Sequence, residues 1–560
     1  MNSADVCEIA GADEILPAVR AGDCARGPFL RIPPYPGARI RKFTALHREG
    51  VSPHHVIDCL RQNRVGGTYW GSQPEVPGNH VLVRSAAALG AARSFAQGRE
   101  IFLWNESHEN GEEIRDHQVI SGECDPWHLL SSAAALVAEQ SDELHLIASL
   151  IGVPSYAPDA VDDRAVQVSA DIPERIVHAL SETLFENPFT GEPMDALEAV
   201  ELCGFWRNLI DSNRDIAGGL GFAFWKQDHV GSLLWGGNRP FRFLRAGTAV
   251  ESGTSVAIWR TKAAPEVVAD LECRAVSLIE VEDGFLRSQG LGADCIPPLS
   301  ITVDRRGAYF DPSQPSELED LLQAGEFDAQ LLSRARELRR LIVEAGLGKY
   351  GLATDVLDRP AAERRHVLVP GQVEDDRAVQ TGGCGLVSNL DLLARVRKEA
   401  PDSYIFYKPH PDVLAGHRRG MIPDRTALRY ADEVISGTAI APLIEMVDEV
   451  HVNTSLAGFE ALLRGKAVTT YGVPFFAGWG LTRDLGPVPA RRRAKRTLDE
   501  LVAAALLLYP RYLDPVTGLP CPAEIVVSRL SVREESDAGL IVGMRRLQGK
   551  FMRRLRSLVQ

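Results

Sequence analysis

From Gly218 onward the chain alternates short apolar segments with longer amphipathic ones, and this alternation restricts the fold more than any other sequence feature. The apolar segments are GLGFAFW, TSVAIW, AVSLIEV, RHVLVPG, SYIFYKP, DEVHVNTS and AVTTYG. Three segments long enough for helices lie between the last four, namely LDLLARVRKEA, ISGTAIAPLIEMV and LAGFEALLRGK. Strict alternation of strand and helix predicts an α/β fold whose parallel sheets are covered on both faces.

The strands form two sets, before and after about residue 360, and a helical stretch separates them. That stretch reads SELEDLLQAGEFDAQLLSRARELRRLIVEAG. Two doubly wound domains that face each other bind ligands in the cleft at the carboxyl ends of their strands. Polar residues that follow the apolar segments are therefore the candidate site.

Upstream of these sets the pattern is mixed. Residues 1–165 contain short apolar runs and then DPWHLLSSAAALVAEQSDELHLIASLIGV, whose periodicity predicts a helix, a turn and a helix. Residues 172–215 predict two helices around an NPFTGEP turn. A length of 560 residues suits three or four domains.

Composition excludes several classes of protein. A formal net charge of −14 argues against a general nucleic-acid binder. The nine cysteines contain no CxxC pair, which is typical of a reduced cytosolic protein without a zinc knuckle or disulfide framework. The acidic N-terminus has no apolar signal-peptide core, and no run reaches about 18 apolar residues. We expect a cytoplasmic protein.

The strand AVSLIE runs into EVEDGFLRSQG, residues 280–290. Glu282, Asp283 and Arg287 at a strand end suit acid–base chemistry or ligand binding, although acids and glycine are also ordinary turn residues. The segment VLVPGQVEDDRAVQTGG, residues 367–383, likewise follows an apolar strand with Gln372 and Asp376. Its acids could instead form a surface loop, and no partner ligands lie at a metal-site spacing.

Two further motifs follow strands. In YIFYKPHPDV, prolines fix the backbone around Lys408 and His410, which could neutralise a phosphate or move a proton. In HVNTSLAGFEALLRGK, a strand passes into a helix whose first residues suit phosphate, and Glu460 could accept from ribose hydroxyls or simply complement the helix dipole. The polar residues between strand and helix are Asn453, Thr454 and Ser455.

Three other segments have weaker signals. The loop VPFFAGWGLTRD could close a pocket through Phe475, Phe476 and Trp479, or cover a core edge. The C-terminal MRRLQGKFMRRLRSLV predicts a basic amphipathic helix that either lies on anionic membrane or packs on the domain. A second basic run, RRRAKR at 491–496, could serve the same surface.

In combination, EVEDGFLRS, VPGQVEDD, YKPHPDV, NTSLAGFEALLRGKAVTTYGVPFFAGWGLT and YPRYLDPVTGLPC resemble the capsule-polysaccharide β-Kdo transferases of the KpsC and LipA type. The resemblance covers roughly residues 185–530. It implies a GT-B architecture, with two Rossmann-like domains and a cleft between them. It also implies a transferase that moves the acidic sugar Kdo from CMP-β-Kdo, with retention, to a Kdo acceptor on lysophosphatidylglycerol at the inner membrane.

The resemblance also implies roles for residues. Asp376 matches the family nucleophile, Glu282 is the candidate acid or base, and Lys408 with His410 matches the phosphate side. No metal and no cofactor are implied beyond the donor CMP-Kdo. The implied partners are a Kdo-containing glycolipid, the inner-membrane surface and other capsule biosynthesis or export proteins.

The expected domains follow from these boundaries. They are an N-terminal α/β segment 1–165, a helical connector 172–215, an acceptor-side domain 216–360, a CMP-Kdo-binding domain 361–530 and the helix 531–560. Segment 1–165 has no second EDG, GQxxxD or KPHP motif, so we interpret it as a degenerate or truncated half of a second transferase module. It could serve as an acceptor-binding or assembly domain. A GT-B enzyme for a UDP-sugar and a non-catalytic scaffold for capsule export remain the alternatives.

Overall fold

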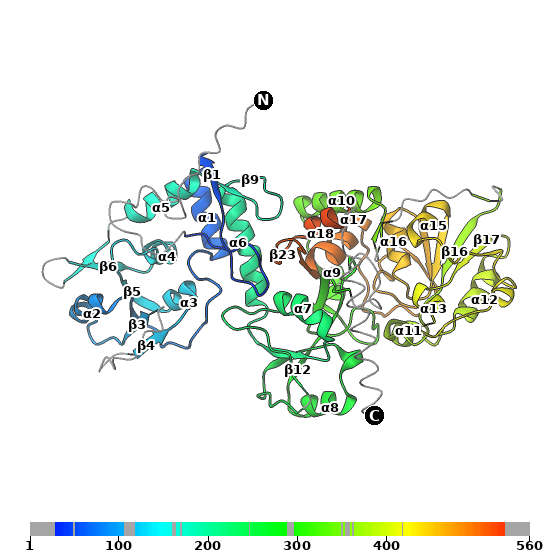
Figure 1. Ribbon diagram of the computed structural model, residues 1–560, viewed down its shortest axis with the longest axis horizontal. Helices are drawn as coiled ribbons and strands as arrows, with labels where there is room; N and C mark the ends of the chain where they lie inside the picture. The colour runs from blue at the N-terminus through cyan, green and yellow to red at the C-terminus, as the bar shows by residue number, and fades with distance from the viewer. Residues whose placement is uncertain are drawn as a thin grey trace. The chain divides into compact units, whose positions relative to one another are not determined.

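The chain forms two compact units in the computed structural model (Figure 1). Unit 1 comprises Met1–Asp215, Leu234–Phe241 and Val516–Leu519, and unit 2 comprises Ile216–Leu233, Arg242–Pro515 and Pro520–Gln560. The structure describes residues 29–48, 51–105, 118–159, 164–168, 171–245, 247–287, 296–348, 351–352, 359–360, 363–416 and 418–531. The C-terminal helix expected at 531–560 lies almost entirely outside these residues.

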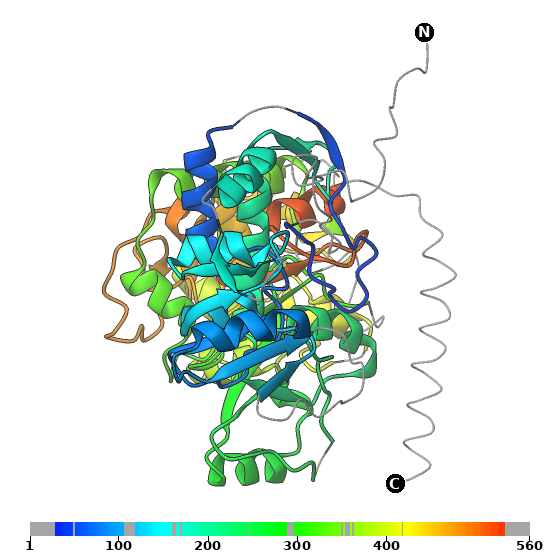
Figure 2. The same cartoon turned by 90° about the vertical axis from the view of Figure 1, so that its left-hand side faces the viewer.

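Unit 1 is built around a six-stranded sheet in the order β4-β3-β2-β5-β6-β7, here called the β2 sheet. Neighbouring strands are parallel except β6 and β7. Its blue and cyan elements can be followed in Figure 2. The strands are β2 (His80–Val83), β3 (Ile101–Asn105), β4 (Gln118–Ser121), β5 (Ala133–Val137), β6 (Ser155–Pro158) and β7 (Ala165–Gln167).

Strand β5 corrects the helix-turn-helix predicted from DPWHLLSSAAALVAEQSDELHLIASLIGV. The structure has α3 (Pro126–Ser131), then β5, then α4 (Leu144–Ile151). Alanine favours helices, but β5 pairs with two neighbours and its last three residues are fully buried. Tertiary packing therefore overrides local propensity here.

The segment 172–215 is also more than two helices around a turn. Helix α5 (Asp171–Ser181) is followed by the hairpin β8 (Thr183–Glu186) and β9 (Pro193–Met194), and then by α6 (Ala196–Asp211). Strand β8 also pairs with β1 (Ala45–Arg48). Helix α6 packs on α1 (Pro53–Asn63) and belongs to unit 1, so this segment is part of a domain rather than a connector.

Unit 2 contains two six-stranded sheets and the small pair β14 (Leu347–Gly348) and β15 (Gly351–Leu352). The first large sheet, here the β12 sheet, has the order β10-β11-β12-β13-β22-β23. Its last two strands, β22 and β23, come from residues beyond 509. They join this sheet because β22 pairs with β13. The acceptor-side domain, expected at residues 216–360, thus also contains these two strands, which were expected in the domain 361–530. The strands are β10 (Ile216–Leu220), β11 (Ser255–Ile258), β12 (Ser277–Asp283), β13 (Ser300–Asp304), β22 (Pro510–Leu513) and β23 (Pro520–Cys521).

The second sheet, here the β16 sheet, has the order β18-β17-β16-β19-β20-β21 and is parallel throughout. Strands β16, β17, β19 and β20 fall where alternation predicted them, and α12 (Asn389–Glu399), α15 (Ile440–Met446) and α16 (Ala457–Leu463) follow the predicted helices. The strands are β16 (His366–Pro370), β17 (Tyr404–Lys408), β18 (Glu433–Val434), β19 (Glu449–Val452), β20 (Ala467–Thr470) and β21 (Arg483–Asp484).

Unit 1 repeats a part of unit 2. Numbered along the chain, both the β2 sheet and the β16 sheet have the strand order 3-2-1-4-5-6, and the first strand reads HVLV in each. Each sheet is followed along the chain by a hairpin around a similar turn, NPFTGEP or DPVTGLP, and then by a helix, α6 or α18 (Ala523–Ser531). This repeat supports the interpretation of unit 1 as half of a second module.

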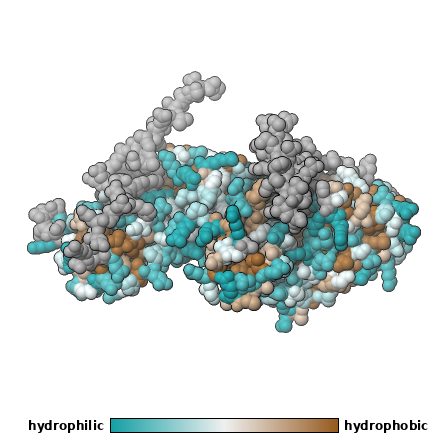
Figure 3. Space-filling view, turned by 60° about the horizontal axis from the view of Figure 1, so that its bottom comes forward, coloured by the Kyte–Doolittle hydropathy of each residue, from teal (hydrophilic) through white to brown (hydrophobic). Residues whose placement is uncertain are grey.

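Three of the five cations in the basic run RRRAKR are paired within unit 2, while Arg493 and Lys495 are exposed. Arg491 and Arg492 both bond to Glu319 in α9 (Glu317–Ala324), and Arg492 is 8% exposed. Arg496 pairs with Glu500. These three arginines tie the loop to unit 2, and the membrane role considered for the run stays a prediction. Figure 3 shows a face on which hydrophilic residues predominate and hydrophobic residues form separate small groups.

No helix among the described residues is long and apolar enough to cross a membrane.

Candidate active site

A pocket of about 500 Å³ opens at the carboxyl ends of β16, β17 and β19. Strands β16 and β19 lie on either side of the point where the strand order reverses, where doubly wound sheets bind ligands. The β12 sheet and the segment after it add Glu282, Asp283, Tyr309 and Phe310 to the wall. Nine of the eleven predicted site residues line this pocket; Arg287 and Asn453 do not.

Gln372 joins the ends of β16 and β19. Its Nε2 donates to Thr454 Oγ1 at 2.9 Å, and its Oε1 accepts from the backbone N–H of Thr454 at 3.0 Å. A Cβ on the preceding Gly371 would lie 2.8 Å from the Tyr407 hydroxyl, so this close approach requires glycine. The Gln372 amide therefore shapes the pocket floor.

Asp376 is the acid of GQVEDD that lines the pocket. It caps α11 (Arg377–Gly382), where its Oδ1 accepts from the backbone N–H of Ala378 at 3.0 Å. The neighbouring Asp375 instead pairs with Arg418 Nη2 at 3.3 Å, and its side chain is 49% exposed. The geometry thus separates two adjacent carboxylates that the sequence alone leaves equivalent.

Lys408 and His410 line the same pocket from the end of β17. Lys408 is 6% exposed and donates to the carbonyl of Thr438, and burial lowers the pKa of its ammonium. The backbone N–H of Asp412 donates to His410 Nδ1 at 3.2 Å. A neutral His410 ring therefore carries its proton on Nε2.

The start of α16 contributes Thr454, Ser455 and Glu460, of which Glu460 is 6% exposed. Ser455 Oγ accepts from the backbone N–H of Ala457 at 3.3 Å. Asn453 is buried behind the pocket, where its side chain donates to the carbonyl of Leu386. Asn453 thus holds the loop before α12 in place.

Glu282 lies opposite, at the end of β12, with its side chain 16% exposed. Arg377 Nη1 lies 3.0 Å from Glu282 Oε1 and 3.2 Å from Glu280 Oε2, so one guanidinium bridges the two sheets of unit 2. Burial raises the pKa of Glu282 to about 8; Arg377 opposes this shift, while Asp283 and Glu280 add to it. The Glu282 carboxyl is a stronger base than an ordinary glutamate.

We expect Glu282→Gln to change how stability depends on pH. The folded-state pKa of Glu282 lies above its usual 4.5, so the folded protein binds more protons than the unfolded chain between those values, and this contribution to stability is lost as pH rises toward 8. The variant should therefore unfold at a higher temperature than wild type at pH 8.5, with a smaller difference at pH 5. Thermal unfolding at the two pH values measures this, and equal differences at both would contradict the raised pKa.

Asp283 is held by two cations. Lys226 Nζ donates to its Oδ1 at 2.9 Å, and Arg287 Nε donates to its Oδ2 at 2.9 Å. Burial alone would raise the pKa of Asp283, but Lys226 and Arg287 outweigh it and hold the pKa below its usual range. Arg287 is 2% exposed, does not line the pocket and contacts it through Asp283. The Asp283 carboxylate is thus a fixed negative charge beside Glu282.

Sequence reasoning missed Lys226 and Arg377. Lys226 is the last residue of the short 3-10 helix η4 (Phe224–Lys226) in GFAFWK, and its Nζ lies 3.4 Å from the centre of the Trp259 ring. The available signal was a lysine that directly follows a tryptophan at the end of the predicted strand GLGFAFW. The observed strand β10 ends earlier, at Leu220, because Gly221 has a φ of +83° and turns the chain.

Replacing Lys226 by methionine should destabilise unit 2. The change leaves the Asp283 carboxylate with one cation instead of two, and breaking a buried ion pair costs roughly 3 kcal/mol. Chemical denaturation measures the loss. The double variant Lys226→Met/Asp283→Asn is the control, since it removes the unpaired charge and should lose less than the sum of the single variants. Strict additivity would show that the two residues do not interact.

Of the three aromatic residues expected to close the pocket, only Phe475 lines it. Phe475 packs on Phe285 with ring centroids 4.7 Å apart. Phe476 and Trp479 have no exposed surface and belong to the core. The other two aromatic side chains therefore support the loop from behind.

No group of three or more His, Cys, Asp or Glu side chains among the described residues is placed to hold a metal ion.

The parallel sheet predicted before residue 360 is correct only for β10, β11 and β12, since β13, β22 and β23 pair antiparallel. This mixed β12 sheet and the parallel β16 sheet share one pocket, an arrangement of the GT-B glycosyltransferase type. The family described as "Capsule polysaccharide biosynthesis protein" matches residues 254–347 and 339–512. The chain belongs to this family, in the group of the KpsC and LipA proteins.

The similar proteins come from several bacteria. The chain is 34% identical over 426 residues to the capsule polysaccharide modification protein LipA of Neisseria meningitidis serogroup A, covering 73% of this chain and 60% of LipA. It is 46% identical over 264 residues to the lipopolysaccharide-processing protein LpsZ of Rhizobium meliloti, covering 46% of this chain and 60% of LpsZ. The chain thus spans about 60% of the length of these curated relatives.

Among solved structures, the chain is similar to the β-Kdo 2,4 transferase KpsC of Thermosulfurimonas dismutans. The identity is 32%, the match covers 56% of this chain and 98% of that one, and the TM-score is 0.49.

Proposed function

We propose that unit 2 is a retaining β-Kdo transferase that takes Kdo from CMP-β-Kdo and adds it to a Kdo-containing glycolipid in capsule polysaccharide biosynthesis. One observation carries the proposal. Asp376 and Glu282, from the two sheets, line one pocket together with Lys408 and His410. The identity to a β-Kdo transferase supports the choice of sugar.

The stereochemistry requires two displacements, because a β donor and a β product share one configuration. In the first, the Asp376 carboxylate attacks the anomeric carbon, the bond from that carbon to the phosphate oxygen breaks, and CMP leaves with the electron pair. In the second, an acceptor hydroxyl attacks the same carbon from the other face and the ester bond to Asp376 breaks. The ionised Glu282 takes the hydroxyl proton.

Two hydrogen-bond donors of the pocket suit the departing phosphate. Lys408 lies at the end of β17, and His410 presents Nε2 as a donor when neutral. Donors that are fixed before the reaction stabilise charge as it develops without reorganising. We assign Lys408 and His410 to this role, and Glu460 to the ribose.

The donor nucleotide distinguishes this proposal from a UDP-sugar transferase. We expect CMP to raise the unfolding temperature and UDP to leave it nearly unchanged, because a ligand stabilises only the state that it binds. Glu460→Gln should weaken CMP binding about tenfold through loss of a charge-assisted hydrogen bond. Calorimetry measures the affinity; Glu445→Gln, on α15 away from the pocket, is the control. Unchanged CMP affinity in Glu460→Gln would remove Glu460 from the ribose site.

A non-catalytic scaffold is the remaining alternative. Such a protein has no need for a base of raised pKa opposite a second carboxylate, and these are the features that the pocket combines. The proposed acceptor is a membrane lipid, and we therefore propose a location at the cytoplasmic side of the inner membrane. The other capsule proteins remain proposed partners.

A further inference from the structure

Unit 1 contains a second hollow, of about 810 Å³, whose lining residues all belong to that unit. It lies among the last turns of α1, α4 and α6 and beside α3. Gln73 precedes β2 and Ser131 precedes β5, so the hollow is at the amino ends of these strands. The lining residues are Arg61, Arg64, Gln73, Trp127, His128, Ser131, Leu150, Ile151, Arg207, Asp211, Arg214 and Asp215. This edge is opposite the one where a doubly wound sheet binds nucleotides.

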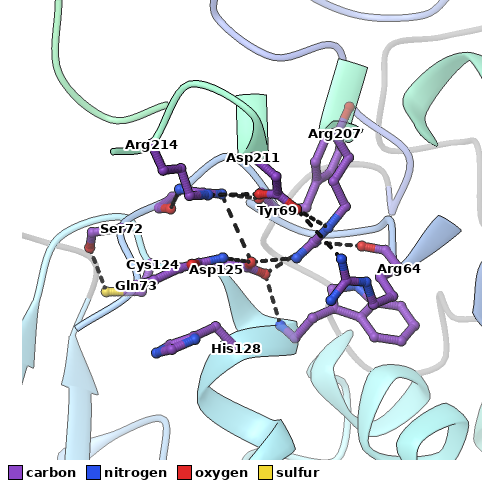
Figure 4. A network of polar contacts seen from close by, with 12 residues as sticks. Arg64, Tyr69, Ser72, Gln73, Cys124, Asp125, His128, Arg207, Asp211 and Arg214 are labelled. Atoms are coloured by element: carbon purple, nitrogen blue, oxygen red, sulfur yellow. Dashed lines mark hydrogen bonds and ion pairs between the residues drawn. The ribbon is translucent and has the colours of Figure 1, made fainter. Parts of the chain in front are cut away.

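The floor of the hollow is a buried ion pair (Figure 4). Asp125 has no exposed surface and caps α3, and its Oδ2 accepts from Arg207 Nη2 at 2.6 Å and from Gln73 Nε2 at 2.9 Å. Arg207 is 2% exposed. The floor is therefore rigid, and its charges compensate each other.

Other arginine donors cover backbone carbonyls that would repel an anion. Arg207 Nη1 donates to the carbonyl of Arg64 at 2.6 Å, at the end of α1, and Arg61 Nε donates to that of Leu150 at 3.2 Å, in α4. Arg214 donates to the carbonyls of Gly71 and Tyr69. One carbonyl at the end of α1 and one in the last turn of α4 are thus covered by arginine donors, which weakens the negative ends of these two helix dipoles.

The rim carries donors that are not used in this way. The Arg61 and Arg64 side chains are 52% and 57% exposed. Arg61 Nη1 lies 3.7 Å from Asp58, and Arg64 Nη2 lies 3.6 Å from Asp211, which is longer than a hydrogen bond. Both guanidinium groups can turn toward a ligand.

The other lining groups indicate the kind of ligand. Counting the buried Asp125, four arginines stand against three aspartates, so the site keeps a small positive excess in a chain of net charge −14. Asp211 Oδ1 accepts from Arg214 Nε at 2.7 Å, and the carboxylates of Asp211 and Asp215 have further lone pairs that can accept hydrogen bonds from hydroxyl groups. Trp127 gives an apolar wall. A ligand with one anionic group, several hydroxyls and an apolar ring face satisfies all three.

We propose that this hollow binds an acidic saccharide, with its carboxylate or phosphate between Arg61 and Arg64 and its sugar ring near Trp127. The site is distinct from the transferase pocket and does not depend on the chemistry of unit 2. A product or acceptor glycan that contains an acidic sugar belongs to this ligand class.

Three pyranoses that differ in one group test the proposal on the full chain. Hydrogen exchange is measured by mass spectrometry with millimolar glucuronate, glucose 6-phosphate or glucose. We expect glucuronate, glucose 6-phosphate or both to protect peptides that cover 61–64 and 126–131, and glucose to give no protection. Which anion protects identifies the anionic group.

The rim arginines supply the matched variants. R61Q/R64Q should bind the protecting sugar at least about tenfold more weakly, since each lost charge-assisted bond is worth a tenfold change or more. R41Q/R99Q removes two charges from unit 1 outside the hollow and should bind like wild type. Equal protection by glucose, protection only in other segments, or full binding by R61Q/R64Q would each overturn the proposal. The three-sugar comparison on wild type stands even if the double variant does not fold.

Discussion

Asp376→Asn should lose Kdo transfer by about a thousandfold or more while it continues to bind CMP. The amide has nearly the shape of the carboxylate and can still cap α11, because its oxygen can accept from the N–H of Ala378. It cannot form the glycosyl ester that a retaining double displacement requires. Steady-state transfer and CMP calorimetry measure the two properties separately.

Asp375→Asn is the matched control for this prediction. Asp375 is adjacent in sequence but pairs with Arg418 and does not line the pocket. We expect it to keep turnover within a few-fold of wild type. Near-normal transfer by Asp376→Asn would remove Asp376 from the role of nucleophile.

Glu282→Gln should slow transfer by about a hundred- to ten-thousandfold, the usual contribution of a general base. Since the pKa of Glu282 is raised to about 8, its basic form increases with pH, and the wild-type transfer rate should rise up to about pH 8. The variant should lose this rise. It should also accumulate Kdo on the protein, because the first displacement does not need Glu282.

Comparison of the two variants separates the half-reactions. Asp376→Asn forms no adduct, whereas Glu282→Gln forms it and fails to pass it on. An unchanged pH profile in Glu282→Gln, or no adduct in that variant, would show that Glu282 does not act on the acceptor.

Much of unit 2 was predictable because its strands and helices carry strong local patterns. HVLVP, YIFYK, EVHV and AVTT are apolar runs that end in polar residues, and the structure places them as β16, β17, β19 and β20. Polar residues after these strands were predicted to form one site, and the structure confirms that one pocket is lined by Asp376, Lys408, His410 and Glu460.

The errors arise where long-range contacts decide the structure. Alternating patterns could not show that β22 returns to pair with β13 some 200 residues earlier along the chain. They also could not show that AAALV becomes strand β5, because its strand neighbours are supplied by other segments. The strand order of unit 1 is set by pairing between distant segments, so local patterns could not predict it.

The missed site residues have the same cause. Lys226 and Arg377 do not line the pocket themselves. They act on two acids that do line it and that lie far away in sequence, since Lys226 bonds to Asp283 and Arg377 bonds to Glu282. Asp375 pairs with Arg418, whereas Asp376 caps α11 and lines the pocket. Such assignments depend on side-chain geometry rather than on motif spacing.

The central claim is that this chain transfers Kdo with retention by way of Asp376. The most direct measurement holds wild type with CMP-Kdo without acceptor, and then analyses intact protein and peptides by mass spectrometry. We predict a mass increase of one Kdo residue, located on Asp376, that disappears when a Kdo acceptor is added and yields a β-linked product. An adduct on Asp375 or Asp283, or release of a Kdo product without any adduct, would contradict it.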